Sequence, residues 1–137
     1  FLKHWFLLRV LIEFNKMVIY NVTTHVEPSI EDAWVEWMRE IHLPEMLATK
    51  KFKSAKIFKV VNEQDQGGTS YAVQYHCISQ EILKQYIENE AQLLRKAGEE
   101  KFGNRILFFR TELQLIEEQS WNPFAQKRNW GNTFWQI

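Results

Sequence analysis

One stretch, Ser29–Phe52, constrains the fold most, because it combines a helical apolar stripe with a proline at a defined place. Apolar residues recur every three or four positions, and charged residues fill the opposite side. The stripe comprises Ile30, Ala33, Trp34, Trp37, Met38 and Ile41. This period is typical of a helix that covers a hydrophobic core. Pro44 lacks an N–H and clashes with the preceding turn, so we expect the helix to stop or kink near His42–Leu43.

Four stretches with the two-residue period of β-strands and a second helical stretch accompany this helix. In chain order the sequence predicts a strand at Met17–Val26, the helix, strands at Ala55–Val61 and Tyr71–Ile78, a second helix capped by Ser79 and ending near Gly98 or Gly103, and a last strand at Arg105–Ile116. The polar segment Asn62–Gly68, which ends in two glycines, predicts a hairpin turn between the second and third strands.

The order strand, helix, strand, strand, helix, strand is the ferredoxin-like βαββαβ arrangement, an α+β fold. Its two helices cover one face of a four-stranded antiparallel sheet and leave the other face open. Right-handed crossovers place the first and third strands in the centre, and we expect these two to run parallel to each other. The second and fourth strands would then form the edges.

The chain of 137 residues is long enough for one domain with one core. We expect this domain to span residues 17–118. Residues 1–16 are interpreted as an extension outside the core, because the clean strand pattern begins at Met17. Residues 119–137 form an aromatic-rich tail. So many aromatic side chains favour packing over the domain or over a neighbour, because burying each one is favourable by about 2 kcal/mol.

Charge and cysteine content exclude several classes of protein. Seventeen basic residues balance seventeen acidic ones, so nucleic acid is not an expected partner. The apolar run near the start of the chain is interrupted by charges and is shorter than the roughly 20 residues of a spanning helix, so no membrane partner is expected. The lone Cys77 has no internal disulfide partner, which predicts a reducing, cytoplasmic location.

Four segments carry a resemblance to a known family: MVIYNVT in the first strand, WVEWMREIHLPEMLATKKF in the first helix and its corner, YAVQY in the third strand and FFRTEL in the last. They resemble a family of small, uncharacterised ferredoxin-like proteins that is labelled a domain of unknown function and is similar to dimeric α/β-barrel proteins. The resemblance covers Met17 to about Glu118. It implies a ferredoxin-like fold, a dimeric α/β barrel and a homodimer, but no catalytic residues.

The open face of the sheet is predicted to hold a mixture of polar and apolar side chains. We assign to it Ile19, Asn21, Thr23, His25, Phe58, Val60, Ala72, Gln74, His76, Ile78, Phe108, Arg110 and Glu112. Such a mixture suits a wet dimer contact or a ligand cavity. His25 and His76 are expected at comparable heights on neighbouring strands, where two imidazoles could bind a metal or exchange protons. No third ligand is evident, so no metal and no cofactor are expected.

Two further candidate ligand-binding residues, Trp34 and His42, lie on the first helix. His42 is interpreted mainly as a corner residue that caps carbonyls at the helix end. The alternative is that it lines a pocket with Trp34 or Trp37. The candidate ligand-binding residues are therefore Asn21, Thr23, His25, Trp34, His42, Gln74, His76 and Arg110.

These observations support two hypotheses about function. The first is a homodimeric module that binds a small molecule or a protein through the open face. The second is a cofactor-independent enzyme of the dimeric α/β-barrel type, a monooxygenase or isomerase acting on a small hydrophobic ligand, with His25 or His76 carrying the proton. No catalytic motif decides between them.

Overall fold

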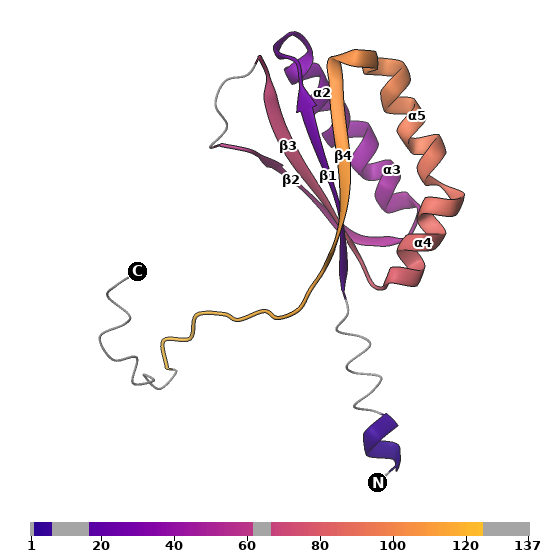
Figure 1. Ribbon diagram of the computed structural model, residues 1–137, viewed down its shortest axis with the longest axis vertical. Helices are drawn as coiled ribbons and strands as arrows, with labels where there is room; N and C mark the ends of the chain where they lie inside the picture. Colours follow the sequence, from indigo (N-terminus) through magenta and orange to yellow (C-terminus); the bar gives the residue numbers. More distant parts are fainter. Residues whose placement is uncertain (1, 7–16, 62–66, 125–137) are drawn as a thin grey trace.

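The computed structural model describes residues 2–6, 17–61 and 67–124 of the chain. From the first strand to the last, the helices and strands are β1 (Val18–Val26), α2 (Glu31–Trp37), α3 (Leu43–Ala48), β2 (Phe52–Lys59), β3 (Thr69–Cys77), α4 (Gln80–Asn89), α5 (Ala91–Phe102) and β4 (Ile106–Gln114). Figure 1 shows the helices α2–α5 on one side of the sheet, whereas no helix of the described residues covers its other side. The predicted ferredoxin-like βαββαβ fold is confirmed.

The four strands are hydrogen-bonded in the order β2-β3-β1-β4, so the predicted central and edge strands are correct. The predicted parallel orientation of β1 and β3 is wrong, because Val18 lies opposite Cys77 and Val26 opposite Thr69. The reason is topological: the hairpin between β2 and β3 reverses the chain, while the crossover from β1 returns β2 in the same direction as β1. Every neighbouring pair is therefore antiparallel.

The first helix does not stop at the His-Leu-Pro corner. A π-helical turn at Met38–His42 joins α2 to α3, and the Leu43 N–H bonds to the Met38 carbonyl five residues earlier. Pro44 lies in the first turn of α3. A proline inside an α-helix clashes with the carbonyl four residues before it, and the wider π turn gives the ring room. Because the π turn contains one extra residue, His42 faces the helix–sheet cavity in place of Ile41. The Ile41 side chain is 45% exposed.

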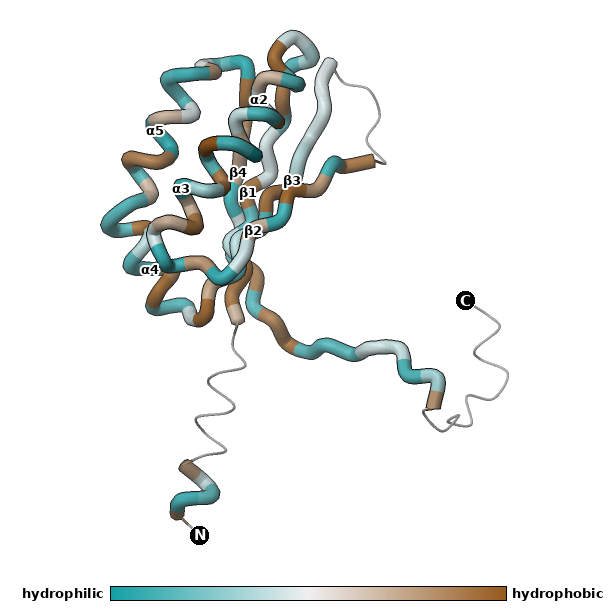
Figure 2. The backbone as a smooth tube through the Cα atoms, turned by 180° about the vertical axis from the view of Figure 1, so that it is seen from behind, coloured by the Kyte–Doolittle hydropathy of each residue, from teal (hydrophilic) through white to brown (hydrophobic). Residues whose placement is uncertain are grey.

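The second helical region begins as predicted, because the Ser79 hydroxyl accepts a hydrogen bond from the Ile82 N–H at 3.2 Å. It is divided at Glu90 into α4 and α5. Figure 2 shows hydrophilic and hydrophobic positions alternating along both helices, as amphipathic packing on a sheet requires. The region ends at Gly103, whose φ of +60° favours glycine.

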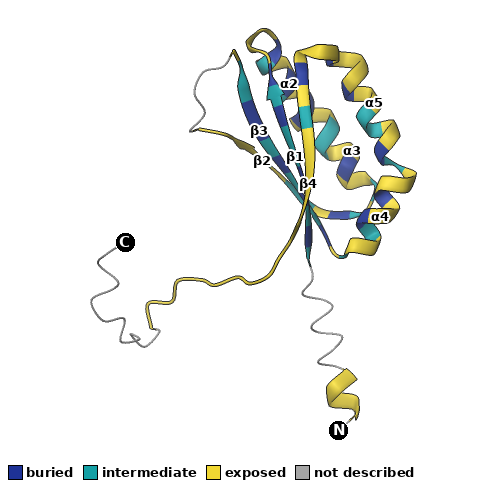
Figure 3. Ribbon diagram, viewed as in Figure 1, coloured by how far each residue is buried: buried dark blue, intermediate teal, exposed yellow. Residues whose placement is uncertain are grey.

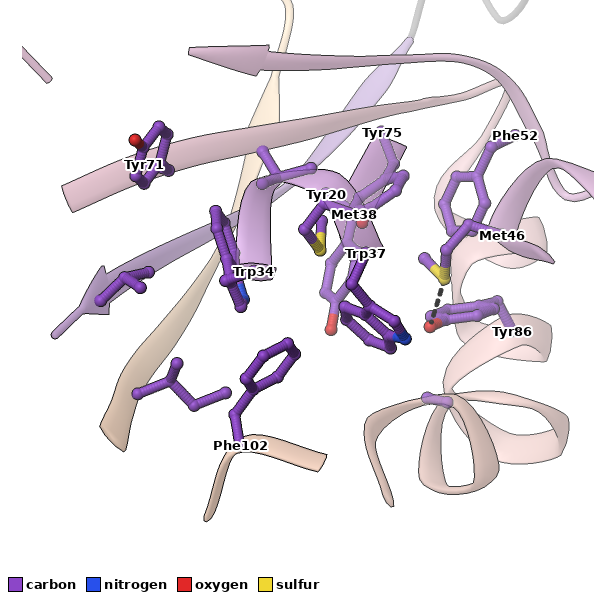
Figure 4. Packing of buried hydrophobic residues seen from close by; sticks show 14 of the residues in the cluster. Tyr20, Trp34, Trp37, Met38, Met46, Phe52, Tyr71, Tyr75, Tyr86 and Phe102 are labelled. Carbon is purple, nitrogen blue, oxygen red and sulfur yellow. Dashed lines mark hydrogen bonds between the residues drawn. The ribbon is translucent and has the colours of Figure 1, made fainter. Parts of the chain in front are cut away.

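Aromatic side chains dominate the core between the sheet and the helices (Figure 4). Tyr20, Phe52 and Tyr86 form one group, with ring centroids 4.9–6.3 Å apart. The Tyr86 hydroxyl donates to the Met46 sulfur at 3.1 Å, the contact drawn as a dashed line in Figure 4. Figure 3 shows that burial concentrates on β1 and β3, whereas the edge strand β4 is exposed along most of its length.

The segments on either side of the sheet carry exposed side chains. Residues 2–6 are helical and exposed, whereas the predicted extension is otherwise outside the described residues. Trp121 and Phe124 are 88% and 92% exposed, so for these two residues packing of the tail over its own domain is wrong. Residues 125–137 lie outside the described part of the chain. Across residues 2–6, 17–61 and 67–124, no helix is long and apolar enough to cross a membrane.

Candidate functional site

The strand register separates the predicted site residues into two groups on opposite sides of the sheet. Asn21 lies opposite Gln74, so both belong to one row of the pleat. Thr23, His25 and His76 share that row, which faces away from the helices. The second group lies on the helix side and consists of Trp34, His42 and Arg110. The eight residues therefore do not form a single site.

The predicted pairing of the two histidines on the open face is wrong. His25 lies opposite Ser70, whereas His76 lies opposite Ile19, six residues away along β1. At about 3.4 Å per residue, six residues correspond to roughly 20 Å. The expectation assumed parallel strands, and the antiparallel order places the two imidazoles near opposite ends of the strand pair.

Polar groups on the open face bond to one another both along β1 and across to its neighbouring strands. The Asn21 side-chain amide donates to the Thr23 and Thr111 hydroxyls, each at 3.2 Å. His25 Nδ1 lies 3.1 Å from the Ser70 hydroxyl. Burial, and then the nearby Lys56 charge, lower the pKa of His76. Asn21, Thr23 and His25 therefore bond to neighbouring side chains on this face.

The assignment of faces on β4 is also wrong. Phe108, Arg110 and Glu112 lie opposite Thr24, Val22 and Tyr20, which belong to the helix-facing row of β1. Phe109 instead faces the open side and is 61% exposed. The segment ILFFRTEL has apolar residues in both rows, so its own pattern could not fix its orientation. The hydrogen-bonded register with β1 determines which β4 side chains face the helices.

A cavity of about 80 Å³ lies between the helix side of the sheet and the helices. One water needs roughly 10–15 Å³ by this measure, so there is room for several waters or a small organic molecule. The lining residues are Tyr20, Val22, Thr24, Trp34, Trp37, Met38, His42, Met46, Val73, Tyr75, Tyr86, Leu94, Arg95, Gly98, Glu99, Ile106, Phe108 and Arg110. Because Glu99 and Arg110 are exposed, they mark the side on which the cavity opens.

His42 contributes a neutral imidazole to this cavity. Its ring stacks on Trp37, with centroids 4.8 Å apart and planes inclined by 23°. Burial lowers the pKa of His42 to about 4, so the ring is uncharged at neutral pH. His42 Nδ1 is buried and has no hydrogen-bond partner among the described residues. Of the two interpretations of His42, pocket lining is the one that the structure supports.

Sequence reasoning missed the α5 side of the cavity. Arg95 Nη2 donates to the Tyr20 hydroxyl at 3.1 Å, and its buried Nε has no partner within the described part of the chain. A Cβ at Gly98 would lie 3.3 Å from the Trp37 ring, so glycine keeps this wall of the cavity thin. An arginine three residues before a glycine on an amphipathic helix was the available signal. In the described segments, no group of three or more His, Cys, Asp or Glu residues could hold a metal ion.

Comparison with known proteins places this chain in a family and a fold. A family model described as "Domain of unknown function (DUF4286)" matches residues 17–116. No curated protein matches the sequence. A proposed antibiotic biosynthesis monooxygenase from Bacillus cereus is 17% identical, with a TM-score of 0.56 over 77% of this chain and 98% of that one.

Two further solved structures have the same fold. A dimeric ferredoxin-like protein from an uncultured marine organism is 9% identical, with a TM-score of 0.54 over 76% of this chain and 99% of its own. A Bacteroides thetaiotaomicron protein of unknown function, suggested to be an oxidoreductase, is 15% identical with a TM-score of 0.54, covering 74% of this chain and 99% of that one. At these identities the similarity establishes the fold alone.

Proposed function

The chain belongs to the family described as Domain of unknown function (DUF4286), and we propose that it acts by binding a small, largely apolar molecule in the cavity between its sheet and its helices. Protein interiors are close-packed, and voids larger than a water are few. A cavity lined by aromatic side chains and a few polar groups has the composition of a ligand site.

The observation that carries this proposal is the combination of unfilled space with buried polar atoms that lack partners. His42 Nδ1 and Arg95 Nε are buried without a hydrogen bond in the described residues, and both side chains line the cavity. Leaving a buried polar group unpaired costs about 1–3 kcal/mol. A ligand that fills the cavity and bonds to either atom would recover part of that cost.

We assign self-association, rather than ligand binding, to the open face of the sheet. Apolar side chains on this face remain exposed, with Leu107 at 71%, Phe109 at 61%, Phe58 at 47% and Leu113 at 43%. A patch of this kind typically marks an interaction surface, and a two-fold homodimer is the commonest way to cover it. A ferredoxin-like protein of similar fold is described as dimeric, and this supports self-association.

An enzyme without a cofactor is the second candidate, favoured by the uncharged His42 in the cavity. A general base works best when its pKa lies near the operating pH. The pKa of about 4 makes His42 a weak proton acceptor at neutral pH, although its nitrogen remains able to hydrogen-bond. Binding is therefore better supported than proton transfer, and His42 replaces His25 and His76 as the residue to examine.

The proposal is tested by filling the cavity. Gly98→Leu places a side chain toward Trp37 on the cavity wall, whereas Ala97→Leu places a leucine at an exposed position of α5. The neutral aromatic 2-naphthamide is expected to bind the wild type and Ala97→Leu, and to lose at least tenfold in affinity with Gly98→Leu, as measured by calorimetry. Circular dichroism checks that both variants fold. Equal affinity of all three proteins would rule out the cavity as the binding site.

A further inference from the structure

Two hydrogen-bond donors on the inner wall of the cavity, Arg95 Nε–H and the Tyr20 hydroxyl, have no acceptor among the described residues. Arg95 reaches from α5 toward β1, and its Nη2 donates to the Tyr20 hydroxyl at 3.1 Å. The buried Arg95 Nε–H has no acceptor in residues 17–61 or 67–124. The Tyr20 hydroxyl accepts this bond from Arg95, but it donates no hydrogen bond to another described residue.

Both groups keep their protons at neutral pH. Arginine stays charged in proteins. Burial raises the pKa of Tyr20 to about 12, so its hydroxyl also remains protonated. Two donors side by side, one of them charged, match a group that only accepts hydrogen bonds. A carboxylate is such a group, and its bonds to arginine are short and about twice as strong as neutral ones.

The charges around the cavity favour the same ligand chemistry. Burial raises the pKa of the Tyr20 and Tyr86 hydroxyls; the nearby Arg110 charge opposes this rise, whereas Glu112 adds to it at Tyr20 and Glu90 adds to it at Tyr86. No ion pair within the described segments involves Arg95 or Arg110. Among the described residues that line the cavity, the acidic one is Glu99, which is exposed at the mouth together with Arg110. Glu99 and Arg110 offset each other at the mouth, so the partly buried Arg95 is left as a charged group inside the cavity with no ion-pair partner among the described residues.

We infer that the ligand of this cavity is an aromatic or apolar carboxylic acid, whose carboxylate accepts hydrogen bonds from Arg95 Nε and the Tyr20 hydroxyl while its apolar body lies against Trp34 and Trp37. This inference rests on the proposed function, because it specifies the ligand of the same cavity. His42 Nδ1 offers one further contact for a polar substituent.

The test compares two probes of the same shape, 2-naphthoate and its neutral amide 2-naphthamide, with the full-length protein at pH 7. The wild type is expected to bind 2-naphthoate at least tenfold more tightly. Arg95→Met should abolish this preference without weakening the binding of 2-naphthamide. Tyr20→Phe, which keeps the ring but removes the hydroxyl, should reduce the preference severalfold. Lys96→Met, an exposed change on the same helix, should have no effect.

The outcomes separate this inference from the proposed function. Equal affinity of the wild type for both probes, or a preference that survives both Arg95→Met and Tyr20→Phe, would overturn the carboxylate site and leave the cavity proposal intact. If the wild type binds neither probe, both proposals fail. If Arg95→Met does not fold, Tyr20→Phe alone decides, and an unchanged preference in that variant overturns the inference.

Discussion

At the scale of single residues, His42 links the cavity to the stability of the fold. Its pKa is lowered to about 4 because burial disfavours the imidazolium. The unfolded chain, with a histidine pKa of about 6.5, therefore takes up the proton at a higher pH than the folded chain does. The contribution of the neutral His42 ring to the free energy of unfolding is fully present above about pH 6.5 and declines as the pH falls toward 4.

We accordingly expect the free energy of unfolding to fall by about 2 kcal/mol between pH 7 and pH 5 through His42 alone. In His42→Gln, this part of the pH dependence should be missing, as measured by urea denaturation at each pH. The pKa of Glu31 is lowered by the hydrogen bond from Tyr71, so its effect appears only below its ordinary value of 4.5. A His76→Gln control accounts for the second histidine of lowered pKa. A profile unchanged in His42→Gln would show that this ring is not buried as described.

At the scale of secondary-structure elements, the π turn at Met38–His42 directs His42 into the cavity. One inserted residue rotates the following helix by about 100° relative to an unbroken α-helix. The turn ends at His42, and Leu43 separates it from Pro44, whose missing N–H could not have bonded to the Glu40 carbonyl.

Pro44→Ala restores that N–H and should allow the turn to relax toward an α-helix. We expect a protein at least as stable as the wild type that binds 2-naphthamide more weakly by severalfold, because His42 rotates away from Trp37. Thermal unfolding and calorimetry measure the two effects, and Glu45→Ala serves as an exposed neighbouring control. Unchanged affinity would mean that core packing, rather than the proline, imposes the π turn.

The same element shows how far the sequence predicts this molecule. The periods of apolar residues predict the order of helices and strands, and from that order the fold and the strand order of the sheet follow. The site depends on register and rotation, which those patterns leave open. A constant helical period puts Ile41 inward, and only the π turn replaces it with His42. On β4, the adjacent Phe108 and Phe109 fit either face until pairing with β1 separates them.

At the scale of the whole molecule, the open face is where we expect a second copy to bind. Phe109 projects from this face, whereas Phe108 lines the cavity. A two-fold interface contains each substitution twice, once from each subunit. Phe109→Asp should therefore convert the dimer into a folded monomer, as measured by analytical ultracentrifugation. Phe108→Asp should leave the dimer intact if the chain folds, and reduce ligand binding. A wild type that sediments as a monomer at micromolar concentration would contradict the assembly.

The central claim is that a small molecule binds between the sheet and the helices rather than on the open face. Two-dimensional ¹H–¹⁵N NMR of the wild type during titration with 2-naphthamide tests it most directly. We predict shifts of the Trp34 and Trp37 indole signals and of the Gly98 amide, with the Thr23 and Gln74 amides unmoved. Shifts confined to Thr23, Gln74 and their neighbours on the open face would contradict the claim.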